Sequence, residues 1–508
     1  MRVKLILTAT VLSCFGMTAN AEQVMETDVV VVGAGASGSA AAYALTEQGL
    51  KVINLEKLPQ TGGTGQFSEG IFAVESKIQR ENNHVFTRDQ AFKLVMDYSH
   101  WRPNAKLVRN YINKSADTID WLQDLGVHFE KLTSNYPGGY YTWHIYQGRG
   151  RAVIDVLQQH FAEKGGKLLV KTAGKQLITD EKGKVVGLMA ESSGGDAIRI
   201  NAKTVVIATG GFGSNKEMLT EYTRFPDVEV VGIPGKVGDG IKMAWAAGAA
   251  KDGREFINMS YRPGPSKEST TNHYAASAKQ PHLWLNTKGE RFTNEANIEQ
   301  WPFAGNALEN QGGTMFVLYD EDTKNYMIDH GIDVGVGVMV PVATKLTKLE
   351  EHFAKGEAAG KAFRANSIKE LAQKTGMDYQ TLKDNIERYN QFCNVRHDED
   401  FVKDARYLRP VAKAPFYAVK SVATSLGTLG GVKVNEKLQA VDDKNIPVSG
   451  LYVIGNDAGG MYGDSYDLVM AGSTVGFAIN SARIAAENIA QDLGAKKPMV
   501  IKASDKKI

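Results

Sequence analysis

The sequence predicts an α/β protein in which a nucleotide-binding domain is interrupted by an inserted, helix-rich domain. Three segments support the first part, because each is a buried strand that runs directly into a glycine-rich turn; they start at Thr27, Ala202 and Ser449. They lie far apart in the chain but resemble one another, so we expect them to meet in one sheet. The second part rests on the charged, helix-rich sequence between the last two segments.

The first segment has the pattern of one βαβ unit. Asp28 to Val32 is a short apolar run, as expected for a buried strand, and glycines follow at once. Ser39 to Gln48 is predicted to be a helix, and a second strand should end at Glu56.

The insertion is expected at residues 261–414. In its sequence "SIKELAQKTGMDYQTLKDNIERYNQFC", apolar residues recur at helical spacing, which predicts a packing face made by Leu371, Leu382, Ile386 and Tyr389. The nucleotide-binding domain should then consist of residues 22–260 and 415–508, preceded by a signal peptide at 1–21.

The N-terminal sequence "MRVKLILTATVLSCFGMTANA" is typical of a secretory signal cleaved after Ala21. Its apolar run is too short to span a bilayer comfortably and no later run is long enough either, so we expect an exported protein without an integral membrane segment. A lipoprotein signal at Cys14 is the alternative. The formal net charge of +2, without a long Lys/Arg run, gives no support for nucleic-acid binding.

Cysteine content limits the redox chemistry of the mature chain. The sequence holds 2 cysteines, and only Cys393 remains after the expected cleavage. One cysteine builds no disulfide, no Cys-x-x-Cys-His haem site and no iron–sulfur ligand set. Any electrons that the protein uses must therefore come from another molecule.

A dinucleotide signal follows the first strand. Gly33, Gly35 and Gly38 form G-x-G-x-x-G, where the glycines permit a tight turn, approach of the backbone to a pyrophosphate, and close packing of helix on strand. The pyrophosphate would lie at the helix N-terminus, where free N–H groups and the helix dipole favour negative charge. Glu56 would accept hydrogen bonds from the adenosine ribose.

Further glycine-rich turns favour FAD over NAD, because a flavin dinucleotide needs several close backbone approaches along its length. They occur after the ribose acid, in "ATGG", in "VGDG" and in "GLYVIGNDAGG". The residues expected to contact FAD are Gly33, Gly35, Ala36, Ser37, Gly38, Glu56, Gly62, Gly63, Thr64, Gly65, Thr209, Gly210, Asp239, Asn456, Asp457 and Gly472.

Taken together, "VVVGAGASG", "GGTGQ", "ATGGF", "GDG", "GERFTNE", "APFYAV", "TLGGV" and "GLYVIGNDAGG" resemble the flavoprotein subunits of the fumarate reductase and succinate dehydrogenase superfamily. The likeness is strongest to the soluble periplasmic flavocytochrome c enzymes and to urocanate reductase, and it covers nearly all of the mature chain. It implies a Rossmann-like FAD-binding domain interrupted by a mobile α+β capping domain, with the substrate between cap and flavin.

The resemblance also bears on the cofactor and the electron donor. FAD should be bound noncovalently, because Thr64-Gly65-Gln66 stands where relatives with a covalent link carry a histidine. The usual flavocytochromes carry a multihaem domain that this chain lacks. The resemblance thus implies a periplasmic flavin subunit that receives electrons from a separate multihaem c-type cytochrome.

The substrate positions depart from the family pattern. Glu299 stands where fumarate reductases carry the proton-donating arginine, and Arg262 stands where a histidine precedes a proline. The family's histidine pair becomes Leu426-Gly427, its Thr-Glu pair falls near Tyr274, and its second arginine near Val469. A carboxylate about 4 Å from a substrate carboxylate costs on the order of 4 kcal/mol at an effective dielectric near 20. A dicarboxylate substrate is therefore not expected.

The candidates for the catalytic residues are Arg262, Tyr274, Glu299 and Tyr466. Arg262 is expected either to anchor a substrate anion or to neutralise Glu299, and a purely structural Arg–Glu pair is the alternative. The two tyrosines could donate protons if a cation assists them, because an unperturbed phenol has a pKa near 10.

Other side chains near these positions predict the character of the site. Trp301 and Tyr261 make the predicted substrate pocket more aromatic than a fumarate site. His273 and His282 are interpreted as loop histidines, and no metal-ligand spacing accompanies them, so no metal site is predicted.

The leading hypothesis is an FAD-dependent oxidoreductase that reduces the C=C bond of a small-molecule electron acceptor other than a dicarboxylate. Two alternatives remain open. The first is a dehydrogenase of the 3-ketosteroid type, which runs the chemistry in reverse with tyrosines in place of arginines. The second is a flavoprotein that relays electrons between partners without an organic substrate.

Overall fold

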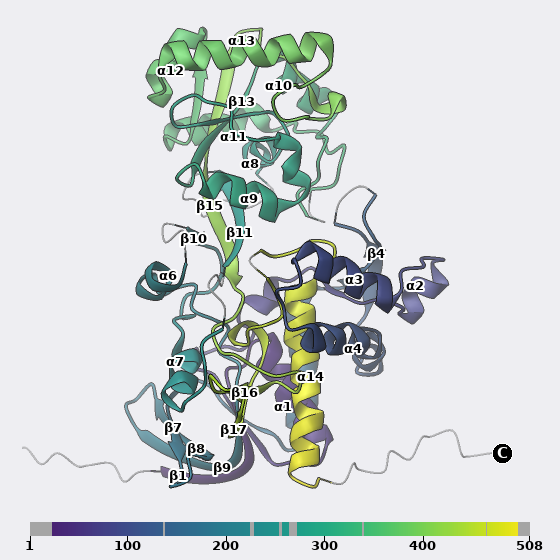
Figure 1. Cartoon of the computed structure of the whole chain (residues 1–508), viewed down its shortest axis with the longest axis vertical. Helices are drawn as coiled ribbons and strands as arrows, with labels where there is room; N and C mark the ends of the chain where they lie inside the picture. The colour runs from purple at the N-terminus through teal and green to yellow at the C-terminus, as the bar shows by residue number, and fades with distance from the viewer. Residues whose placement is uncertain are drawn as a thin grey trace, which may run out of the picture.

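The computed structural model describes residues 23–135, 138–223, 228–252, 257–263, 272–337, 340–463 and 465–495. The chain forms two lobes joined by a narrower waist (Figure 1). The lower lobe contains both described ends of the chain, and the upper lobe is built from its middle. The predicted signal peptide lies outside the described residues.

The lower lobe is organised around an eight-stranded sheet with the order β16-β17-β9-β1-β2-β6, to which β8 and β7 attach at β9. The central strand β1 (Gln23–Val32) pairs in parallel with β2 (Val52–Leu55) and β9 (Ala197–Ile207), and β17 (Pro447–Val453) pairs in parallel with β9. The predicted meeting of three distant segments in one sheet is confirmed. The remaining strands are β6 (Lys167–Leu169), β7 (Thr172–Thr179), β8 (Val185–Ser192) and β16 (Gln439–Val441).

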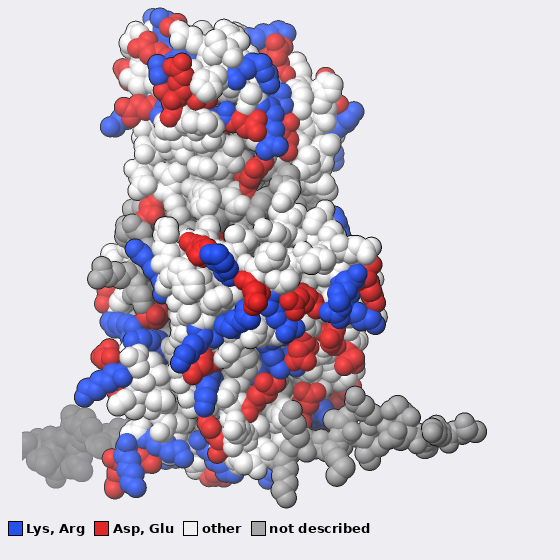
Figure 2. All heavy atoms as spheres, turned by 45° about the vertical axis from the view of Figure 1, so that its right-hand side comes forward, with Lys and Arg blue, Asp and Glu red and all other residues white. Residues whose placement is uncertain are grey.

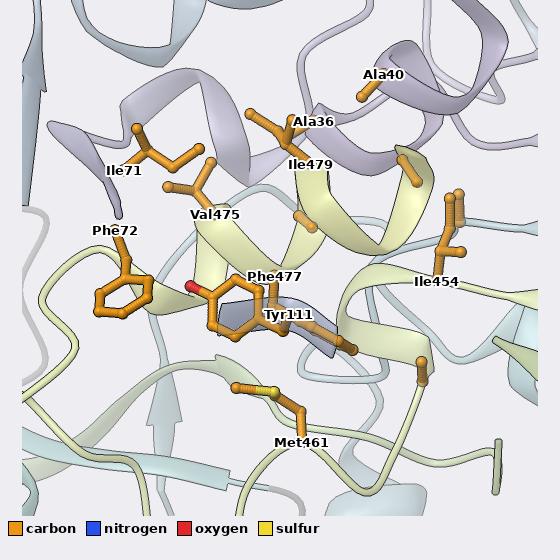
Figure 3. Close-up of a cluster of buried hydrophobic side chains, with 14 of the residues drawn as sticks. Ala36, Ala40, Ile71, Phe72, Tyr111, Ile454, Met461, Val475, Phe477 and Ile479 are labelled. Atoms are coloured by element: carbon orange, nitrogen blue, oxygen red, sulfur yellow. The ribbon is translucent and has the colours of Figure 1, made fainter. Parts of the chain in front are cut away.

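Helices α1 (Ala36–Glu47) and α14 (Ser473–Asp492) pack against each other beside this sheet. Small side chains at the contact, such as Ala36 and Ala40, let the two helices approach closely, and Val475 and Ile479 of α14 fill the space between them (Figure 3). Tyr111, from α4 (Ala105–Asp124), closes the other side of α14. The glycine-rich turns thus rest on a close-packed base.

The other elements of the lower lobe surround this base. A three-stranded sheet, β3-β5-β4, lies beside α14, which contacts β3. The helices and strands of the lower lobe that have not yet been given bounds are η1 (Thr64–Phe67), β3 (Gly70–Phe72), α2 (Lys77–Glu81), α3 (Arg88–Tyr98), β4 (Phe129–Thr133), β5 (Trp143–Tyr146), α5 (Arg149–Glu163), α6 (Lys216–Tyr222), α7 (Asp239–Ala246) and η4 (Gly455–Asp457).

The upper lobe contains most of a six-stranded sheet built around β15 (Phe416–Thr428), which pairs with β10 (Glu229–Val230), β11 (Ile257–Pro263), β13 (Thr314–Tyr319) and β14 (Ala362–Ala365). Strand β12 (Leu283–Asn286) pairs with β13. The helices of this lobe are α8 (His273–Ala278), η2 (Glu295–Glu299), α9 (Trp301–Glu309), α10 (Glu321–Asp329), α11 (Leu349–Ala358), α12 (Ile368–Thr375), α13 (Tyr379–Val395) and η3 (Ala405–Tyr407).

Helices α12 and α13 cover one face of this sheet at the far end of the upper lobe (Figure 1). The four apolar residues that were predicted to form a packing face are buried together there, in a core separate from that of the lower lobe: Leu371, Leu382, Ile386 and Tyr389. That prediction is confirmed. Gly376, in a left-handed conformation, ends α12 and separates the two helices.

The fold class is α/β, as predicted, with a second lobe inserted in the dinucleotide-binding one. The predicted boundary between residues 414 and 415 falls just before β15. This strand pairs with most strands of the upper-lobe sheet, which we call the cap sheet, and then reaches the lower lobe. We therefore propose that the chain returns to the FAD-binding domain within β15. The sequence "APFYAV" did not reveal this, because a strand is equally apolar in either sheet.

Surface charge is mixed. On the face drawn in Figure 2, Lys and Arg are interspersed with Asp and Glu over both lobes, and the waist carries few charges. This face thus presents no broad basic area of the kind that binds nucleic acid. None of the described helices is long and apolar enough to cross a membrane.

Candidate functional site

A cavity of about 590 Å³ lies where the glycine-rich turns of the lower lobe converge. This volume is in the range of cofactor sites, roughly 300–1,000 Å³. Of the sixteen residues predicted to contact FAD, those that line the cavity are Gly33, Gly35, Ala36, Ser37, Glu56, Gly63, Thr64, Gly65, Thr209, Gly210, Asp239 and Asn456. The pattern of turns therefore located the cavity.

The turn between β1 and α1 forms one wall. Gly33 has a φ of +105°, and a Cβ on Gly38 would lie 1.8 Å from the Gly33 carbonyl oxygen, so α1 can begin against the strand only with glycine at this position. No side chain caps the N-terminus of α1. The first turn of the helix faces the cavity, and it offers backbone N–H groups and the positive end of the dipole to a pyrophosphate.

Glu56 stands at the end of β2 beside this turn. Its carboxylate accepts hydrogen bonds from the N–H of Ala34 at 3.0 Å and from the N–H of Leu58 at 2.9 Å. The side chain is buried and lines the cavity. A carboxylate has about four acceptor positions, so Glu56 can also accept from ribose hydroxyls. This end of the cavity is suited to the adenosine half of FAD.

The opposite end is formed by the end of β15 and the start of α14. The lining residues here are Leu426 and Gly427 of β15, Leu429 just after it, and Thr474 and Val475 of α14. No side chain caps the N-terminus of α14 either. A second helix dipole therefore places positive potential on this end.

Asp457 does not line the cavity but supports one of its walls. Its carboxylate is fully buried and accepts hydrogen bonds from the backbone N–H groups of Thr209, Gly210 and Gly211 and from the Thr209 hydroxyl. Burial raises the pKa of this carboxyl, while these hydrogen bonds lower it. The structure thus assigns Asp457 the task of fixing the 209–211 turn.

Three other predicted FAD contacts also lie outside the lining: Gly38, Gly62 and Gly472. Gly62 donates its N–H to the carbonyl of Ala34 at 2.9 Å. Gly472 is the N-cap of α14, in the left-handed conformation. Together with Gly38, these glycines shape the backbone of the site from behind.

Several lining residues were not predicted, above all the segment 231–236 and Lys57. Lys57 forms an ion pair with the predicted Asp239 at 2.6 Å. Gly232, Pro234 and Gly235 immediately precede the "VGDG" turn, so their turn chemistry was a usable signal. Thr172, Ala173 and Gly174 of β7 gave no such signal.

The cap residues proposed for catalysis do not line the cavity. Arg262 of β11 pairs with Glu229 of β10, so it does not neutralise Glu299, and that alternative is wrong. Glu299 instead accepts a hydrogen bond from the Tyr407 hydroxyl and lies 3.3 Å from an Arg406 nitrogen. Both ion pairs arise from residues that are neighbours only in the folded chain.

The two predicted tyrosines have different surroundings. Tyr274 is fully buried in the cap, and a Cβ on Gly356 of α11 would lie 3.2 Å from its ring, so it has no access to the cavity. Tyr466 accepts a hydrogen bond from Ser473 at 3.1 Å and packs with Leu429, a cavity residue, and with Trp301 of the cap. Of the proposed proton donors, only Tyr466 lies beside the cavity.

The histidines that the sequence singled out lie in the cap. His273 accepts a hydrogen bond from the Lys348 N–H at 2.9 Å, and the buried His282 lies 3.3 Å from the Met327 sulfur. Within the described residues, no group of three or more His, Cys, Asp or Glu side chains is placed to hold a metal ion.

Residues 28–469 match the protein family described as the FAD binding domain. The chain belongs to this FAD-binding family. FAD is therefore its cofactor, and the site fits it, because Thr64 directs a buried hydroxyl, without a hydrogen-bond partner among the described residues, toward the cavity.

Several reductases resemble this chain over most of its length. It is 37% identical to a vinyl phenol reductase of Lactiplantibacillus plantarum, over 91% of this chain and 96% of that protein. It is 25% identical to a fumarate reductase (cytochrome) of Shewanella frigidimarina, over 91% of this chain and 77% of that protein. The resemblance to fumarate reductase flavoproteins is confirmed, and the chain is an FAD-dependent oxidoreductase.

Among solved structures, the chain is similar to 3-ketosteroid delta1-dehydrogenase from Sterolibacterium denitrificans, with a TM-score of 0.74, 20% identity, and coverage of 92% of this chain and 100% of that one. At this identity the likeness concerns the fold alone.

Proposed function

We propose that this protein reduces the C=C bond of a vinyl or propenyl group conjugated to a phenol ring, with electrons from a separate c-type cytochrome. The observation that carries the proposal is the side chain at the end of β15. Leu426 lines the cavity and is 44% exposed. The sequence resemblance places it at the position where the dicarboxylate enzymes carry a histidine. The vinyl phenol reductase similarity over nearly the full length of both chains supports the same substrate class.

The surroundings of Leu426 are suited to an aromatic ring. Leu429, which lines the same cavity, packs with Tyr466, and Trp301 and Tyr462 pack against these two. Apolar and aromatic side chains stabilise a phenyl ring by burial and by ring contacts. A carboxylate in this environment would lose its hydration without gaining a cation, which disfavours fumarate.

Reduction of the bond requires a hydride on one carbon and a proton on the other. Bound FAD, in its reduced form, supplies the hydride. Tyr466 is the side chain that we propose for the proton, since its hydroxyl meets those of Ser473 and, through it, Tyr462. This chain of hydroxyls can return a proton to Tyr466 after each turnover.

The proposed donor follows from the cysteine content. The 508 residues contain no pair of cysteines with haem-attachment spacing, which supports a separate cytochrome as the donor in this proposal. The name of the Shewanella relative, fumarate reductase (cytochrome), supports the same class of donor. Export to the periplasm, where such cytochromes act, stays a prediction from the N-terminal sequence.

The proposal is tested by anaerobic single turnover. The holoprotein is reduced with dithionite and mixed separately with 4-vinylphenol, fumarate and urocanate, and reoxidation is followed by flavin absorbance. We expect 4-vinylphenol to react roughly a hundredfold faster than fumarate, a ratio that pocket contacts can supply. Faster reaction with fumarate would contradict the proposal.

A variant ties the result to the β15 end. Leu426→Asp should slow reaction with 4-vinylphenol by roughly tenfold or more, because it places a charge against the ring. Val85→Asp, at a position that is 88% exposed and does not line the cavity, is the matched control and should react like the native protein. Equal rates in the two variants would remove Leu426 from the substrate site.

A further inference from the structure

Lys236 is a buried cation in the wall of the FAD cavity. Its side chain is 9% exposed and lines the cavity, and within the part of the chain that the structure describes it forms no ion pair. Its backbone carbonyl accepts a hydrogen bond from the Ser214 N–H at 2.8 Å, which holds the residue in place. A buried ammonium without a counterion costs free energy, so such a group is expected to serve an anionic partner.

Two further polar groups converge on the same point. A Cβ on Gly232 would lie 3.0 Å from the Lys236 Nζ and 3.1 Å from the Thr64 Oγ1. A Cβ on Gly427 would lie 3.2 Å from the Asn456 Nδ2 and 3.9 Å from the Lys236 Nζ. Glycine at both positions therefore leaves open the space in which an ammonium, an amide and a hydroxyl meet.

The course of segment 231–236 indicates which half of FAD would lie next to Lys236, Asn456 and Thr64. A Cβ on Gly235 would lie 3.3 Å from the Lys57 side chain, next to the ribose acid Glu56, whereas Lys236 reaches toward Gly427 at the β15 end. The adenosine half belongs at Glu56, so the β15 end receives the isoalloxazine ring. Lys236 lies on the flavin side of the cavity, and Lys57 lies on the adenosine side.

Burial lowers the pKa of Lys236, as expected for an ammonium that lacks a carboxylate partner. An anion brought next to it would favour the charged form again. The isoalloxazine ring provides such an anion on reduction, because the two-electron reduced ring loses its N1 proton near neutral pH. A fixed positive charge beside the ring makes it easier to reduce.

We propose that Lys236, with Asn456 and Thr64, binds the isoalloxazine ring of FAD and stabilises the negative charge that the ring takes up on reduction. Lys236 thereby sets the redox potential of the flavin. This assignment rests on the FAD site alone, so it stands or falls independently of the organic substrate.

The test uses sulfite, which adds to flavin N5 and leaves a negative charge on the ring. For Lys236→Met we expect sulfite to bind at least tenfold more weakly than to the native holoprotein. The two-electron midpoint potential should fall as well, and a tenfold change in that equilibrium is about 30 mV. Lys236→Arg keeps the charge and should restore both values.

Lys203→Met is the control, because it removes the same charge from the lower lobe at a side chain that is 63% exposed and does not line the cavity. Its sulfite dissociation constant and the equilibrium constant of flavin reduction should stay within twofold of the native values. Native values in Lys236→Met, or an equal change in Lys203→Met, would overturn the proposal. If Lys236→Met retains too little FAD, Lys236→Gln is measured at saturating FAD, and the same two outcomes decide.

Discussion

Asp398 illustrates how buried charges are compensated in the cap. Its carboxylate accepts hydrogen bonds from two Arg291 nitrogens at 2.8 and 2.7 Å and from the Lys403 N–H at 3.0 Å. Arg291 also binds Glu295, which lies 3.2 Å from the Lys403 Nζ. This cluster explains the "GERFTNE" motif, and it fixes the backbone that leads to Glu299.

The Asp398 cluster predicts a pH dependence. Burial alone would raise the pKa of Asp398, but the Arg291 and backbone hydrogen bonds lower it to about 2, from 3.8 in the unfolded chain. The stabilisation is therefore complete above about pH 4 and is lost as the pH falls toward 2. Asp398→Asn should lower the free energy of unfolding by on the order of 3 kcal/mol at neutral pH. It should also flatten the decline of that free energy between about pH 4 and pH 2, and urea unfolding at several pH values measures both effects.

Asp400 provides the control for that measurement. It pairs with Arg388 on the surface, where the arginine side chain is 55% exposed. Asp400→Asn should change the free energy of unfolding by less than about 1 kcal/mol. Equal losses in the two variants would mean that the Asp398 pair contributes no more than a surface pair.

Helix α1 shows how a backbone contact and a binding contact can be separated within one element. Gly38 faces the β1 turn, where a Cβ would lie 1.8 Å from a carbonyl oxygen. Gly35 lines the cavity, and the atoms nearest to its Cβ position are 3.8 Å away. Gly38 therefore serves helix packing, and Gly35 serves the ligand.

Alanine at these two positions should therefore act differently. Gly38→Ala should destabilise the apoprotein by at least about 3 kcal/mol, because strand and helix must separate. Gly35→Ala should leave apoprotein stability within about 1 kcal/mol but weaken FAD at least tenfold, because the methyl group enters the pyrophosphate space. Thermal unfolding of the apoproteins and titration of flavin fluorescence distinguish the two, and an unstable Gly35→Ala apoprotein would contradict this division.

In the molecule as a whole, the cavity is lined by segments from residue 32 to residue 478, which meet only when the main sheet is complete. FAD bound there contacts the folded lobe and not the unfolded chain. Binding of a cofactor to the native state alone stabilises that state by mass action.

Adding FAD to the apoprotein at a hundred times its dissociation constant should raise the free energy of unfolding by about 2.7 kcal/mol. Calorimetry with and without FAD checks this. Because none of the described residues between 261 and 414 lines the cavity, limited proteolysis should show more protection in the lower lobe than in α12 and α13. Protection confined to the cap would place the cofactor elsewhere.

Local patterns in the sequence were sufficient to predict many of the residues that line the cavity. The glycine spacing at 33–38 and the acid at Glu56 depend on one βαβ unit, so their geometry follows from neighbouring residues. The roles of Asp457 and Arg262 could not be predicted in this way. Their partners, Thr209 and Glu229, are distant in sequence, and nothing local identifies them.

The sequence thus determined the α/β class and the dinucleotide turn, because each depends on residue types at short, fixed spacing, and the departure from a dicarboxylate site stays a prediction. Tertiary structure decided which residues share a wall. It placed Tyr274 inside the cap, tied Glu299 to Arg406, and brought Lys236 to Gly427. The physical reason is that ion pairs and cavities form between elements, so they depend on how β15 crosses from the cap to the cofactor.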